Sequence, residues 1–122
     1  MPARPDRRAT GDAAESAARR LLEGEGLRLL ARNVRFKAGE LDLVMREGDT
    51  IVFIEVRFRG DGRFGGALAS VDRGKCRRIA RAAQAWLQRH PALAEAPCRF
   101  DVVAAGPEGA DWLRGAFTLA DV

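Results

Sequence analysis

Apolar side chains near the start of the chain recur every three or four residues, from Ala14 to Leu22. This spacing predicts an amphipathic helix over residues 12–23. The predicted helix can be capped by Thr10 or Asp12, and two glycines follow its end.

The next three segments are rich in leucine, valine and isoleucine and predict strands over residues 27–36, 40–46 and 50–58. A glycine-rich stretch, GDGRFGG, then leads to a second predicted helix over residues 72–90. Pro91 ends this helix because proline cannot donate the next main-chain hydrogen bond.

The second predicted helix has an apolar side and a basic side. Its apolar side carries Cys76, Ile79, Ala80, Ala83, Trp86 and Leu87. Its basic side carries Arg73, Lys75, Arg77, Arg78 and Arg81. Two further strands are predicted over residues 98–105 and 113–119. The order α-β-β-β-α-β indicates an α/β fold, with a mixed sheet between helices.

The sequence Glu47-Gly48-Asp49-Thr50 is typical of a tight turn between the second and third strands. With this turn, Asp42 faces Glu55 and Glu40 faces Arg57 on one side of the hairpin. The other side is wholly apolar and carries Leu41, Leu43, Met45, Val52, Ile54 and Val56. A one-residue slip would mix the two sets, so the pattern favours this register.

The predicted pairing of Asp42 with Glu55 is unfavourable by itself, because like charges on facing strands repel at a separation of about 5 Å. A proton, a basic side chain or a bound cation can neutralise the pair. Two carboxylates offer only oxygen ligands, which suit a hard ion such as Mg²⁺ or Mn²⁺. The alternative is a solvated acidic spot that Arg57 or a neighbouring arginine balances.

Positive charge is concentrated in one part of the chain. The 122 residues include 21 Lys or Arg and 17 Asp or Glu, a formal charge of +4. Residues 57–81 alone hold eight basic and two acidic side chains, which favours a polyanionic partner, usually nucleic acid. Only Lys37 and Lys75 are lysines. The length predicts a single domain over residues 11–122, preceded by a flexible basic arm over residues 1–10.

Several other classes of protein are excluded. Cys76 and Cys98 are too few for a disulfide framework or a zinc site, and His90 has no companion at metal-ligand spacing. The first residues lack the apolar stretch of a secretory signal, and no run of about 18 apolar residues could span a bilayer. We therefore expect a cytoplasmic protein with no membrane partner.

A strand–turn–strand with Asp42, followed by Glu55-Val56-Arg57, resembles the core of the PD-(D/E)xK nucleases, whose α-β-β-β-α-β order also matches. The segments GELDLV, IVFIEVRFR, FGGALASVDRGKCRRI and RFDVV resemble the YraN family of bacterial endonuclease-like proteins, which are related in fold to Holliday-junction resolvases. The resemblance covers about residues 11–105. It implies a restriction-endonuclease-like fold, Mg²⁺ or Mn²⁺ as cofactor and DNA as partner, and it leaves open a homodimer.

The resemblance implies a role for each matching position. Asp42 and Glu55 would bind the metal together with Glu15 from the first helix, and Arg57 would occupy the position of the catalytic cation. Glu40 would support this site. Nucleic acid would contact the basic segment at Arg59, Arg63, Arg73, Lys75, Arg77 and Arg78.

Arg57 departs from the pattern that it otherwise matches, because the nuclease motif places lysine there. Arginine supplies charge and can clamp a phosphate, but it cannot act as a general base. Three alternatives follow: Arg57 only stabilises charge, Lys75 or Lys37 supplies the lysine, or catalysis is weak.

Three functions from different classes are consistent with the sequence. The leading hypothesis is a small Mg²⁺-dependent endonuclease acting on branched or otherwise structured DNA. The second is a nucleic-acid-binding protein with little or no catalysis, for which Arg57 is the motivation. The third is a protein-interaction module whose arginines engage an acidic partner.

Overall fold

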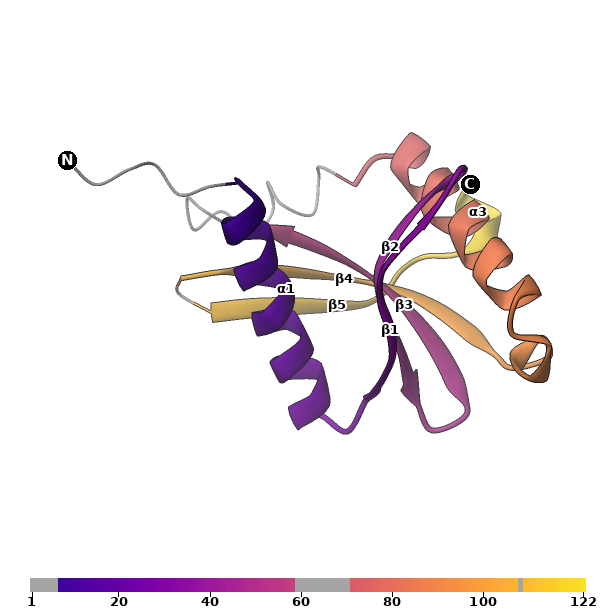
Figure 1. The fold of residues 1–122 in the computed structure, drawn as a ribbon, viewed down its shortest axis with the longest axis horizontal. Helices are drawn as coiled ribbons and strands as arrows, with labels where there is room; N and C mark the ends of the chain where they lie inside the picture. The colour runs from indigo at the N-terminus through magenta and orange to yellow at the C-terminus, as the bar shows by residue number, and fades with distance from the viewer. Residues whose placement is uncertain (1–6, 59–70, 108) are drawn as a thin grey trace.

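The computed structural model describes residues 7–58, 71–107 and 109–122 (Figure 1). In chain order, its elements are α1 (Arg7–Gly24), β1 (Arg28–Phe36), β2 (Gly39–Glu47), β3 (Thr50–Phe58), α3 (Arg73–Gln88), the short 3-10 helix η1 (Pro91–Leu93), β4 (Cys98–Gly106), β5 (Gly109–Phe117) and the 3-10 helix η2 (Leu119–Asp121). This order contains the predicted α-β-β-β-α-β core and adds the predicted last strand.

All five strands form one mixed sheet in the order β1-β2-β3-β4-β5. Neighbouring strands are antiparallel except β3 and β4, which are parallel. A parallel pair needs a crossover connection, and α3 lies in this connection. The helices α1 and α3 lie on opposite faces of the twisted sheet (Figure 1). The predicted α/β fold with a restriction-endonuclease-like core is therefore confirmed.

Each face of the sheet has its own hydrophobic core. Beneath α1, the helix buries Ala14, Ala18 and Leu22 against the sheet, as the helical spacing predicts. Beneath α3, the core is aromatic. The ring of Phe53 stacks on Phe100 with centroids 5.6 Å apart and meets Trp86 edge-on at 6.0 Å.

The β2–β3 hairpin has the predicted register along most of its length. Glu47 pairs with Thr50 next to the turn, and the pairing continues to Leu43 and Ile54. Four apolar side chains of the hairpin share the core beneath α1, namely Leu43, Met45, Val52 and Ile54, and Val56 packs against them. The turn sequence and the alternation of side chains together select this register.

The predicted assignment of side chains to the two faces of the hairpin is wrong at its far end, beyond Leu43. Leu41 packs in the core beneath α3, whereas Leu43 packs beneath α1, so the expected single apolar face is wrong at Leu41. The expected cross-strand ion pair of Glu40 with Arg57 is also wrong. Glu40 instead lies opposite Arg35 on β1, with Arg35 Nε 3.6 Å from Glu40 Oε2.

Two elements, α1 and β5, have a boundary more than two residues from the predicted one, for local reasons. The helix α1 begins at Arg7 and not at residue 12. The prediction depended on the apolar stripe, which starts only at Ala14, so it gave no signal for the residues before the stripe. The strand β5 occupies Gly109–Phe117 and not residues 113–119. Its first residues are selected by pairing with β4, as in Ala105 with Ala110, and not by apolar alternation.

A buried acidic side chain, Asp101 on β4, lies in a fully satisfied polar network. Arg99 donates to both carboxylate oxygens, at 2.9 and 3.0 Å. Trp112 Nε1 and the main-chain amide of Gly115 also donate to Asp101, each at 2.9 Å. Arg99 additionally donates to Glu47, so the network joins β4 to β5 and to the β2–β3 turn.

Within the described residues, none of the helices combines the length and the apolar character needed to cross a membrane. The cytoplasmic location and the homodimer stay predictions.

Candidate active site

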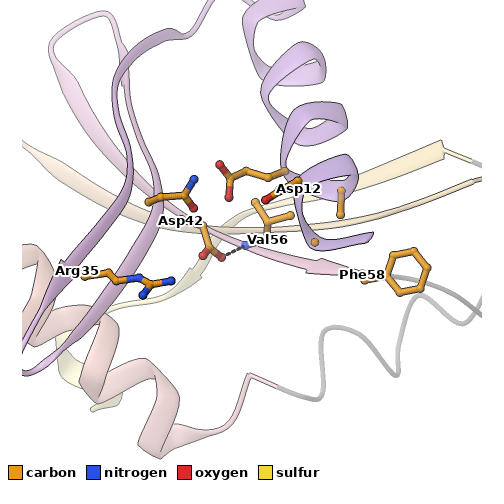
Figure 2. A pocket seen from close by; sticks show the side chains of 9 residues that line it. Asp12, Arg35, Asp42, Val56 and Phe58 are labelled. Carbon is orange, nitrogen blue, oxygen red and sulfur yellow. Dashed lines mark hydrogen bonds between the residues drawn. The ribbon is translucent and has the colours of Figure 1, made fainter. Parts of the chain in front are cut away.

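Two of the predicted catalytic residues, Glu15 and Asp42, line a cavity of about 570 Å³ beside the end of the β2–β3 pairing. Glu55 and Arg57 lie next to Asp42 but do not line this cavity. This cavity lies between the first turns of α1 and the ends of β1, β2 and β3 (Figure 2). Its polar lining comes from Asp12, Glu15, Asn33, Arg35 and Asp42. Phe58 forms an apolar edge and is about half exposed.

Asp42 is held by a hydrogen bond to the neighbouring strand. Its carboxylate accepts from the main-chain amide of Val56 at 2.8 Å, the dashed contact in Figure 2. This bond follows directly after the last main-chain pairing, that of Leu43 with Ile54. The side chain therefore satisfies a main-chain donor on β3 and fixes its own carboxylate at the end of the hairpin.

Glu55 on β3 forms a close acidic pair with Asp42. The residue is only 5% exposed, and its carboxyl group lies next to that of Asp42. Burial, reinforced by the charge of Asp42, raises the pKa of Glu55 to about 7. Burial likewise raises the pKa of Asp42, although the Val56 amide opposes this. At mildly acidic pH Glu55 is therefore largely protonated, which removes the repulsion between the two groups.

Two cations contact the same oxygen of Glu55. Arg57 Nε lies 3.3 Å from Glu55 Oε1, and Lys75 Nζ lies 3.7 Å from it. Both side chains are largely shielded, with exposed fractions of 28% and 24%. The Arg57 Nε is buried and has no hydrogen-bond partner among the described residues, so its contact with Glu55 is an ion pair without hydrogen-bond geometry.

Glu15 faces the same cavity from α1. Burial and the charge of Asp42 raise the pKa of Glu15, while a side-chain hydrogen bond with Asn33 opposes the shift. Asn33 has a φ of 51°, the left-handed conformation that asparagine tolerates better than most residues. Neither Asn33 nor Arg35 was predicted for this site, because their positions depend on the path of β1 beside the cavity.

The donor chemistry of the site fits a hard divalent cation. Asp42 and Glu55 offer only carboxylate oxygens, and a cation can take the place of the proton that neutralises Glu55. Among the described residues, no three His, Cys, Asp or Glu side chains lie close enough together to form a ready metal-binding group. Glu15 acts on Asp42 electrostatically across the cavity and does not form a compact triad with the pair.

The basic side of α3 is divided between the surface and the site. Its exposed arginines are Arg73, Arg77, Arg78 and Arg81, as predicted. Lys75 differs, because its side chain is directed to Glu55. Arg59 and Arg63 lie outside the described residues, and their roles in nucleic-acid binding stay predictions.

The start of α3 is fixed at two points. Asp72 caps the helix by accepting from the main-chain amide of Lys75 at 2.8 Å. Gly39, at the start of β2, lies against the Arg78 main chain: a Cβ atom at position 39 would come within 2.8 Å of the Arg78 carbonyl oxygen. Glycine thus permits a close approach of α3 to β2, and this approach sets the position of Lys75.

Comparison with known proteins identifies the family. The family described as "Uncharacterised protein family UPF0102" matches residues 14–105 of the chain. A UPF0102 protein of Xanthomonas campestris pv. campestris (strain B100) is 55% identical over 123 residues, covering 99% of both chains. A UPF0102 protein of Xylella fastidiosa (strain 9a5c) is 55% identical over 118 residues, covering 95% of this chain and 98% of the relative. The matched residues include the acidic pair and both of its cations, and the chain belongs to the UPF0102 family, the YraN family of the resemblance above.

Proposed function

We propose that this protein is a divalent-metal-dependent endonuclease that cleaves structured or branched DNA. The observation that carries the proposal is the pairing of the half-buried Asp42 and the buried Glu55 with two shielded cations, Arg57 and Lys75, at the edge of a cavity that Asp42 lines. Carboxylates that hold a metal next to cations that hold a phosphate are the parts that phosphodiester hydrolysis needs.

The proposed reaction is hydrolysis of one phosphodiester bond. Water oxygen bonds to phosphorus, the ester P–O bond breaks, and the products are a phosphate monoester and a free hydroxyl group. One proton leaves the water, and the departing alkoxide takes up one. A bound Mg²⁺ or Mn²⁺ would supply positive charge that polarises the phosphoryl group.

The residues of the chain have distinct tasks in this proposal. Asp42 and Glu55 hold the cation, and Glu15 adds negative charge across the cavity. Arg57 stabilises the charge that develops on the phosphoryl oxygens, because its planar guanidinium is positively charged and can bind two oxygens. The exposed arginines of α3 bind the phosphate backbone and orient the duplex.

A cleavage assay tests the proposal. Purified protein is incubated with a synthetic four-way junction and with linear duplex DNA, in Mg²⁺, Mn²⁺ or EDTA. We expect metal-dependent nicking that the double variant Asp42→Asn/Glu55→Gln abolishes. Asp49→Asn is the matched control, since Asp49 is an exposed turn residue that contacts Arg46 and not the site. Equal cleavage by the double variant and the control would exclude this site.

A second candidate function is nucleic-acid binding with little catalysis. The observation that favours it is Arg57 itself, which already forms an ion pair with Glu55 where the nuclease motif would have lysine. Salt-dependent binding of the junction without cleavage in any metal would support this function. Failure to bind DNA at low salt, with an acidic protein partner instead, would favour an interaction module.

A further inference from the structure

We propose that Lys75 supplies, from α3, the lysine that position 57 lacks, and that its ammonium group contacts the phosphate to be cleaved. This inference rests on the proposed function and names a residue for it. Lys75 is far from the hairpin in sequence, yet its Nζ lies 3.7 Å from Glu55 Oε1, the same oxygen that Arg57 approaches. The contact places a lysine at the acidic pair.

The surroundings of Lys75 set it apart from the other cations of the helix. Arg73, Arg77 and Arg78 are exposed, whereas the Lys75 side chain is 24% exposed and directed toward β3. Its main chain is anchored by the Asp72 cap. A general backbone-binding residue needs no such burial or anchoring, so the position of Lys75 indicates a role at the acidic pair.

Charge balance supports a phosphate as the group that Lys75 meets. Asp42 and Glu55 are two carboxylates that lie beside two cations, Arg57 and Lys75, so their charges balance when both carboxylates are ionised. One divalent metal ion would leave this set with an excess positive charge. A phosphodiester anion offsets part of that excess, so the set is complementary to a metal ion together with a phosphate.

Lysine and arginine are complementary at this oxygen. The ammonium group of lysine is compact and has three donors that can rotate toward a phosphate oxygen or toward an attacking water. The Arg57 guanidinium is planar and can clamp two oxygens at once. With both present, the site has a compact ammonium donor on α3 and a planar guanidinium on β3 that can bind two oxygens.

The experiment compares the two lysines of the chain. Lys75→Met removes the proposed phosphate contact, and Lys37→Met makes the same change at an exposed turn residue. Binding of the four-way junction is measured in Ca²⁺ at several salt concentrations. We expect Lys75→Met, but not Lys37→Met, to reduce the slope of log Kd against log salt by about 1. Lys75→Arg, which retains the charge, should preserve the slope.

Cleavage in Mg²⁺ gives a second readout. Lys75→Met should lower kcat by about 10²-fold or more, with a much smaller change in KM. The double variant Lys75→Met/Arg57→Lys should have a kcat at least about tenfold higher than that of Lys75→Met alone. A purely structural role for Lys75 would not produce this recovery.

The two proposals fail in different ways. Wild-type cleavage with equal slopes and rates in both lysine variants would overturn the role of Lys75 and leave the nuclease standing. Junction binding without wild-type cleavage would overturn the nuclease, and the slope would then decide the phosphate contact alone. Absence of binding by the wild-type protein would overturn both.

Discussion

The carboxylate of Asp42 accepts a hydrogen bond of 2.8 Å from the main-chain amide of Val56, one residue beyond the last main-chain pairing of β2 with β3. The same side chain therefore lies at the end of the paired part of the hairpin and lines the cavity of the candidate site. Its two roles separate in two substitutions, because asparagine keeps an acceptor for the amide whereas alanine does not.

Asp42→Asn should stabilise the protein at pH 8 and abolish cleavage. Removal of one charge relieves the repulsion with Glu55, which is strongest when both groups are ionised. Asp42→Ala should be less stable than Asp42→Asn by about 1–2 kcal/mol, because it leaves the Val56 amide without its partner. Urea titrations at pH 8 measure both differences. A less stable Asp42→Asn would show that the hydrogen bond outweighs the repulsion.

The wild-type protein should lose stability as the pH rises from about 5 to 8. The pKa of Glu55 is raised from 4.5 to about 7 in the folded state, so the folded protein binds a proton in this range that the unfolded chain has released. The loss should be on the order of 1–3 kcal/mol. Denaturant titrations across this range check it, and Glu55→Gln should flatten the profile. An unchanged profile in Glu55→Gln would assign the loss to another group.

Mn²⁺ should raise the melting temperature, and more so at pH 8 than at pH 5.5. Metal ions compete with protons for Asp42 and Glu55, whose pKa values are both raised, so binding strengthens as these groups ionise. Differential scanning fluorimetry with Mn²⁺ and with Ca²⁺ measures the shift. Asp42→Asn should lose it, whereas Asp49→Asn should keep it. A shift that persists in Asp42→Asn would place the ion elsewhere.

Asp101→Ala should destabilise the fold by about 3 kcal/mol and leave the candidate site chemically intact. In the wild-type protein, Arg99 and the Trp112 indole N–H donate to the buried Asp101 carboxylate, and the substitution leaves the Trp112 donor without a partner and Arg99 with Glu47 alone. Glu47→Gln, at the exposed end of the same network, should cost less than about 1 kcal/mol. Thermal unfolding compares the two variants, and similar losses would contradict the central place of Asp101.

Gly39→Ala should weaken the site without altering any of its charged residues. The new methyl group would lie 2.8 Å from the Arg78 carbonyl oxygen and would push α3 away from β2. Lys75 would move with the helix, so cleavage should fall about tenfold or more while metal binding by Asp42 and Glu55 persists. Cleavage rates and the Mn²⁺ melting shift, measured together, test this separation. A proportional loss of the cleavage rate and of the Mn²⁺ melting shift would indicate general unfolding of the variant.

Sequence patterns predicted the parts of the fold that depend on neighbours along the chain. The turn at residues 47–50 and the alternation beside it set the register that brings Asp42 close to Glu55. The change of face at Leu41 could not be predicted, because it occurs where a side-chain hydrogen bond takes over from main-chain pairing. The regular alternation of apolar and polar residues does not indicate where a strand changes the face to which its side chains point.

The remaining features of the site depend on how distant elements pack. The direction of Lys75 follows from the docking of α3 on β2, and Asn33 lines the cavity in a left-handed conformation that the pattern of β1 does not indicate. The ion pair of Glu40 with Arg35 was missed because β1 was not placed beside β2 in the predictions. In each case the missing information was which strand or helix lies next to the residue.

The crossover between the parallel strands β3 and β4 has a consequence for the order in which the molecule assembles. Asp42 and Glu55 belong to one hairpin with a two-residue turn, so they can meet as soon as that local unit closes. Lys75 reaches them only after the chain has left the sheet and α3 has docked on its face. The acidic pair is thus a local contact along the chain, whereas its lysine is a non-local one. Any change that loosens the docking of α3 should therefore remove the lysine from the pair while the two carboxylates stay together on their hairpin.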